Sequence, residues 1–186
     1  AARGLFADYR SRRAANTLRR QDNALALFAR YLGAAYAAAR GANTARGADA
    51  ACGADTARGA DAACGAIPEP PTAPALAAAP AAWRGVTWGL VAGFARWLLG
   101  RGYAIGSVNG ALSTVKTYAR LAMQAGTLDR GEYVAIRAVQ GYSRTEGKRV
   151  DEARPAARVG AKKAEPVPLS WEQMHRLKTQ PNTPQG

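Results

Sequence analysis

Basic and small hydroxyl residues gather in three regions of the chain where helices are expected, and such residues could bind phosphates. Arg19 and Arg20 stand near the start of the first region, and Lys116 and Arg120 are one helical turn apart in the second. Guanidinium groups can bridge phosphates or bind guanine in the major groove, while hydroxyl groups and helix N-termini contact the DNA backbone. The third region runs from Arg130 onward. The residues expected to contact DNA are Arg12, Arg13, Thr17, Arg19, Arg20, Ser107, Ser113, Lys116, Arg120, Arg137, Gln140, Arg144, Lys162 and Lys163.

Motifs for catalysis or metal binding are not found in the sequence. It contains no phosphate-binding loop, no nucleophile elbow and no HExxH motif. His175 is the one histidine, too few for a zinc site, and we expect it on a helix surface. The tyrosines stand at or near apolar helical positions, where core or rim packing is more common than nucleophilic chemistry. We therefore expect no catalysis by this chain, no cofactor, no metal and no small-molecule ligand.

The charge of the chain favours a polyanionic partner. It has 26 Lys and Arg against 13 Asp and Glu, a formal net charge of +13. A folded cation of this kind binds nucleic acid through counterion release, although an anionic membrane surface or a ribosome would also attract it. No stretch approaches the roughly 18 apolar residues that span a bilayer. Cys52 and Cys64 occupy equivalent positions of a repeat, so no disulfide is needed to explain them. We expect double-stranded DNA as the partner, no membrane, and a cytoplasmic location.

The apolar residues recur with helical spacing, which predicts an all-α fold. One helix is expected over about 14–38, with Leu25, Phe28 and Leu32 on its apolar stripe. A second helix is expected to follow Thr87 and to end at the glycines 100 and 102. A third is expected to begin at Ser107, as its N-cap, and to end near Gly126. A fourth is expected to open at Asp129 with a capping box. The inward residues expected on the second and third helices are Val91, Phe94, Ala95, Leu98, Val108, Leu112, Val115, Ala119 and Ala122. The fourth is expected to bury Tyr133 and Ile136. About four or five helices would form one bundle.

A repeat and a proline-rich run interrupt this pattern. Residues 39–68 repeat with a period of six residues and carry no large aliphatic residue per unit, so neither a β-solenoid nor a stable helix is expected. The following prolines continue the predicted disorder. Ser170 with Gln173 predicts a capping box that opens a last helix at Trp171. The expected organisation is a first part of a bundle (1–38), a disordered insertion (39–82), the rest of the bundle (83–143), a basic interdomain linker (144–166) and the start of a second domain (167–186).

Three segments of the chain resemble parts of one known family. SRRAANTLRRQDNALALFARYL, from Ser11 to Leu32, resembles the opening helix of the core-binding domain of the tyrosine recombinases, or phage integrases. The tail KKAEPVPLSWEQMHRL resembles the entry into their catalytic domain. The segment from Thr87 to Gly126 resembles the second and third helices of the core-binding domain. Its matching positions are Phe94, Trp97, Leu98, Gly102, Leu112, Ser113, Lys116 and Gly126.

The resemblance implies a SAM-like helical core-binding domain that forms half of a C-shaped clamp around DNA, with other recombinase protomers bound nearby. It also implies DNA integration and recombination by a parent enzyme that cuts and rejoins DNA through a phosphotyrosine, and a nucleoid-associated location in a bacterium or phage. The family's catalytic arginines, lysine, histidines and tyrosine would all follow residue 186, so none is assigned here. The chain departs from the family pattern at Gly110 and Ala111, where relatives often have arginine, and in the long insertion. The alternative interpretation is a non-enzymatic basic helical module that binds RNA or mediates protein assembly.

Overall fold

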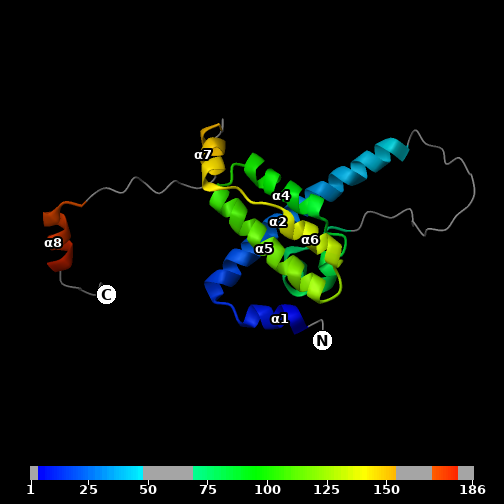
Figure 1. Ribbon diagram of the computed structural model, residues 1–186, viewed down its shortest axis with the longest axis horizontal. Coiled ribbons are helices and arrows are strands. Elements are labelled where there is room, and N and C mark those ends of the chain that lie inside the picture. The colour runs from blue at the N-terminus through cyan, green and yellow to red at the C-terminus, as the bar shows by residue number, and fades with distance from the viewer. Residues whose placement is uncertain (1–3, 48–68, 154–168, 180–186) are drawn as a thin grey trace, which may run out of the picture.

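The computed structural model describes residues 4–47, 69–153 and 169–179, and within these ranges the regular elements are all helices (Figure 1). The all-α expectation is confirmed for this part of the chain. In chain order the elements are α1 (Gly4–Ser11), α2 (Ala15–Gly47), α3 (Ala73–Ala78), the 3-10 helix η1 (Pro80–Trp83), α4 (Trp88–Gly100), α5 (Ile105–Gln124), α6 (Arg130–Ala138), α7 (Arg144–Glu152) and α8 (Trp171–Thr179).

Helix α2 is the longest element, and it packs against α3, α4 and α5. Leu25, Phe28 and Leu32 are buried as their spacing predicts. The expected end near residue 38 is wrong, because the helix continues to Gly47. Its later part is rich in alanine, the strongest helix former, which offsets the cost of the glycines. This end of α2 extends away from the rest of the bundle (Figure 1).

Helices α4 and α5 form as their apolar spacing predicts, and the residues expected to point inward are buried. Thr87 caps α4 by accepting a hydrogen bond from the amide of Leu90. A glycine with positive φ lies two residues after the end of each helix, Gly102 (83°) after α4 and Gly126 (75°) after α5. After α5, the amides of Gly126 and Thr127 donate to the carbonyls of Met123 and Ala122, which is the Schellman arrangement. The glycines therefore end the helices for a conformational reason.

The start of α5 differs from the prediction. Its N-cap is Ala104, and no side chain caps the helix there. Ser107 lies inside the first turn and donates its amide to the carbonyl of Ala104 at 2.8 Å. The expectation that Ser107 is the N-cap is wrong, because the helix begins at Ile105, whose side chain is buried.

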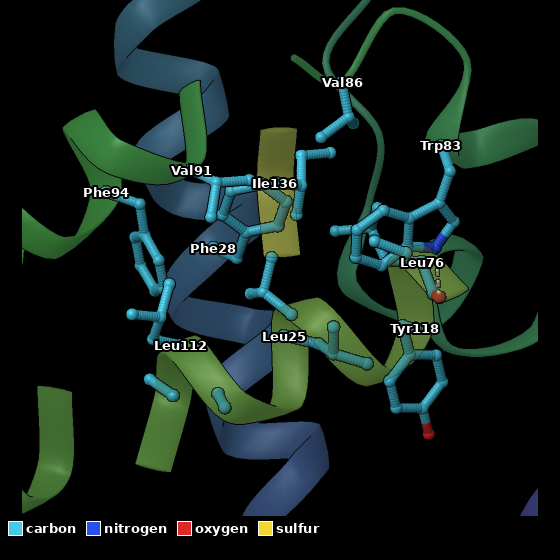
Figure 2. Packing of buried hydrophobic residues seen from close by; sticks show 14 of the residues in the cluster. Leu25, Phe28, Leu76, Trp83, Val86, Val91, Phe94, Leu112, Tyr118 and Ile136 are labelled. Carbon is cyan, nitrogen blue, oxygen red and sulfur yellow. Dashed lines mark hydrogen bonds between the residues drawn. The ribbon is translucent and has the colours of Figure 1, made fainter. Parts of the chain in front are cut away.

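The core is centred on aromatic residues from distant parts of the chain (Figure 2). Trp83 is fully buried, stacks on Phe28 with ring centroids 5.9 Å apart, and donates from Nε1 to the carbonyl of Leu76 at 2.9 Å. The ring of Tyr118 on α5 stacks on Trp83 with ring centroids 6.4 Å apart. Phe94 meets Phe28 edge to face at 5.0 Å.

The expected disordered insertion, residues 39–82, is corrected at both of its ends. Its first residues continue α2 to Gly47, and its last residues form α3 and η1. Thr72 caps α3, and Leu76 is fully buried beneath α2. The segment folds because Leu76 and Trp83 insert into the core together. Residues 48–68, which hold most of the repeat, lie outside the described residues.

The segment after α6 also differs from the expected linker. Ser143 and Glu146 form a capping box, and residues Arg144–Glu152 form α7. The backbone of Gly147 lies so close to Ile105 that an added Cβ would be 3.0 Å from that side chain. The rest of the expected linker, including Lys162 and Lys163, lies outside the described residues. The predicted capping box of α8 is confirmed, with Ser170 and Gln173 exchanging backbone and side-chain hydrogen bonds of 3.0 and 3.3 Å.

Candidate nucleic-acid interface

An open groove of about 480 Å³ runs between α2 and α5. It brings together four of the residues expected to contact DNA: Thr17 and Arg20 from α2, and Ser107 and Ser113 from α5. Asn23 and Thr114 add an amide and a hydroxyl group to the same lining. Thr17 and Arg20 lie on α2 and Ser107 and Ser113 lie on α5, and the packing of these two helices brings the four residues to one groove.

Glycines keep this groove open. Gly106 and Gly110 of α5 line it, and a Cβ built at either position would meet no heavy atom within 4 Å. A large side chain at these positions would project into free space along the groove, so their absence leaves the α5 backbone accessible. At Gly110, where the resembled family often has arginine, the α5 backbone therefore borders the groove without a side chain in front of it.

The uncapped start of α5 opens onto the same groove. The first amides of a helix have no partner within it and carry a partial positive charge. Ala104 provides no side-chain cap, and the amide of Ser107 already donates to the carbonyl of Ala104, so the amides of Ile105 and Gly106 are those left for solvent or a ligand. Ser107 places an exposed hydroxyl group in this first turn.

Arg20 supplies the charge of the groove. Its side chain is exposed, and it forms no ion pair with any residue that the structure describes, as is true of its neighbour Arg19. Arg12 and Arg13 differ: Arg12 pairs with Asp8 at 2.8 Å, and the guanidinium of Arg13 lies 4.7 Å from the ring centre of Tyr9. Arg20 is therefore the predicted arginine best placed to meet a phosphate in the groove.

Lys116 has a structural role that its spacing did not suggest. Its Nζ donates to the carbonyl of Arg137 at 3.1 Å and to that of Val139, and so covers the end of α6. Burial lowers the pKa of this amine. The amine is thus directed at the protein backbone rather than at the groove.

The remaining expected contacts lie elsewhere. Arg120 is exposed on α5, and Arg137 is exposed in the last turn of α6. Gln140 is exposed and lines a second groove, between α4 and α6. The backbone of Arg144 begins α7, and its side chain is outside what the structure describes.

The sequence did not predict a network of hydrogen bonds that lies behind the groove and joins α1, α2 and α5. Arg10 pairs with Asp22 through both terminal guanidinium nitrogens and donates to the hydroxyl of Tyr118 at 3.0 Å. That hydroxyl faces Gln21, whose Nε2 donates to the hydroxyl of Tyr9 at 2.8 Å. Gln21 is almost fully buried and is also one of the residues that line the groove. No spacing rule links α1 to α5, so this network could not be read from the chain.

Among the residues that the structure describes, no group of His, Cys, Asp and Glu could hold a metal ion. None of the described helices is both long and apolar enough to cross a membrane. Comparison of the chain with protein-family models, with curated proteins and with solved structures finds no match.

Proposed function

We propose that the chain is the DNA-binding region of a site-specific tyrosine recombinase or integrase, with a SAM-like core-binding bundle that clamps duplex DNA. The observation that supports it most directly is the α2–α5 groove, where Arg20, hydroxyl groups and uncapped helix amides line an open, glycine-rich surface. The net charge of +13 and the recombinase-like segments support the same interpretation.

The lining chemistry suits the backbone of one DNA strand better than the edges of bases. Ser, Thr and Asn side chains and backbone amides are typical phosphate contacts, and they position DNA without reading its sequence. We therefore propose that the groove holds a phosphate backbone, while Arg120 and Arg137 would contact DNA at other points. Cutting and rejoining would belong to the parent enzyme's catalytic domain, with other protomers bound to the same DNA.

A steric variant tests the groove without changing any charge. Gly110→Leu would fill the groove, and Gly33→Leu would add the same side chain at another open helical position, on α2 outside the groove. Duplex binding measured by fluorescence anisotropy should weaken by roughly tenfold or more for Gly110→Leu and stay unchanged for Gly33→Leu. Equal affinity of both variants for the duplex would show that the groove does not hold DNA.

The alternative, a module for protein assembly, has one observation in its favour. Trp171, Met174 and Leu177 are exposed on α8, which has no buried residue. If these residues mediate self-association, sedimentation velocity will show an oligomer that the double variant Trp171→Ala, Leu177→Ala dissociates. A monomer with groove-dependent duplex binding would instead support the DNA-binding proposal, and preference for an RNA duplex in competition would favour the RNA alternative.

A further inference from the structure

A second groove, of about 500 Å³, lies between α4 and α6, and the duplex-binding proposal makes no use of it. Alanines from both helices line it, which leaves an apolar surface between them. Trp88 and Tyr142 contribute aromatic rings, and Arg96 and Gln140 contribute polar groups. Trp88 is 54% exposed, an unusual state for so large an apolar side chain.

Both aromatic residues are held in place through their backbones. The amide of Trp88 donates to the carboxylate of Glu132 on α6. Asn109 of α5 holds Tyr142 at two points: its Nδ2 donates to the carbonyl at 2.7 Å, and its Oδ1 accepts from the amide at 2.9 Å. These bonds hold the backbone of Trp88 and of Tyr142, while the Trp88 side chain remains exposed to solvent. Because this backbone is already ordered, less entropy is lost when a planar ligand stacks on the rings.

The positive charge of Arg96 favours a planar ligand that carries a negative charge. Arg96 is exposed, has no ion pair among the described residues, and no acidic residue lines the groove. An apolar protein helix in this position would cover an unpaired guanidinium, which is costly. A nucleotide would instead stack its base on the ring and place its phosphate near Arg96.

We propose that the α4–α6 groove binds an unpaired base of single-stranded DNA, with Trp88 as the stacking surface, Arg96 as the phosphate contact and Gln140 as a hydrogen-bonding partner for the base. This site is separate from the α2–α5 groove and does not depend on it. Stacking on aromatic side chains tolerates any base, so little sequence preference is expected.

A short labelled single strand and an abasic strand of the same length separate base stacking from charge. The wild-type chain should bind the abasic strand roughly tenfold more weakly, since stacking is lost while the phosphates remain. Trp88→Ala should remove this difference and leave duplex affinity unchanged. The matched control Trp171→Ala removes a tryptophan that is 75% exposed on α8 and should keep the difference.

A second variant guards against misfolding of Trp88→Ala. Ala135→Leu fills the groove and retains the indole, so it should also remove the preference for the strand with bases. Equal binding of both strands by the wild-type chain would overturn the proposal, as would a preference that survives in a folded Trp88→Ala or Ala135→Leu variant. Loss of self-association in Trp88→Ala, with strand preference intact, would assign the groove to a protein partner instead.

Discussion

The guanidinium of Arg10 donates two hydrogen bonds to the carboxylate of Asp22, with Nη1–Oδ1 at 2.7 Å and Nη2–Oδ2 at 3.1 Å. This pair joins α1 to α2, and Nη1 also reaches the hydroxyl of Tyr118 on α5. The pair with Asp22 raises the pKa of Arg10 further above its usual range. Three helices that line or support the α2–α5 groove are therefore connected through one side chain.

Removing this guanidinium should destabilise the fold. Arg10→Met keeps most of the apolar stem of the side chain and loses the ion pair with Asp22. The free energy of unfolding should fall by about 1–2 kcal/mol, and not by more, because both side chains are partly exposed to solvent. Arg12→Met removes an exposed pair with Asp8 and should cost less than about 0.5 kcal/mol. Urea unfolding checks both. Equal losses would mean that the Arg10 network adds nothing beyond a surface pair.

The glycine inside α5 and the glycine that follows this helix should respond in opposite directions to alanine. Gly126→Ala forces a side chain into positive φ and should destabilise the protein by about 1–2 kcal/mol. Gly110→Ala lies in the interior of α5 with open space around it and should stabilise by roughly 0.5–1 kcal/mol. Thermal unfolding followed by circular dichroism measures both, and destabilisation by Gly110→Ala would show that the helix does not tolerate a side chain there.

The stability of the protein should fall at alkaline pH. Burial raises the pKa of the Tyr118 hydroxyl, although Arg10 opposes the shift, and burial also raises the pKa of Tyr31. Above about pH 10 the unfolded chain therefore loses these protons before the folded chain does, so the free energy of unfolding decreases as pH rises. Tyr118→Phe should make this decline shallower in urea titrations on either side of about pH 10. Parallel declines in the variant and the wild type would contradict the assignment to Tyr118.

Lys116 should matter more to stability than to DNA binding. Lys116→Met leaves the carbonyls of Arg137 and Val139 without their donor and should cost about 1 kcal/mol. Arg120→Met, one turn further on, should change stability by less than about 0.5 kcal/mol. The salt dependence of duplex binding should be the same for Lys116→Met and the wild type. A slope lowered by about one would identify Lys116 as a phosphate contact.

The sequence predicts well those features that neighbouring residues determine. Phe94 and Leu98 are buried because their spacing places them on one face of α4. Asp129 caps α6 by accepting from the amides of Gly131 and Glu132, as its position predicts. Ile136 is fully buried, while Tyr133 is only partly so. The expected box at this cap does not close, since the carboxylate of Glu132 accepts from the amide of Trp88 instead.

Features that depend on distant residues could not be predicted in this way. Leu76 and Trp83 are separated by alanines and a proline, and their burial becomes evident only when Phe28 and Tyr118 are placed beside them. The start of α5 has no capping side chain to mark it. Four expected DNA contacts meet in one groove because α2 and α5 pack together, and that contact has no local signature.

Charge reversal at two arginines of one helix tests the central proposal most directly. Arg20 lines the α2–α5 groove, whereas Arg30 is exposed on α2 outside it, and both changes to Glu alter the net charge equally. In duplex binding at about 50 mM salt, Arg20→Glu should lose roughly tenfold or more in affinity and show a lower salt slope, while Arg30→Glu should lose less than about threefold. Equal losses in the two variants would mean that the total charge alone binds DNA, and would contradict the proposed interface.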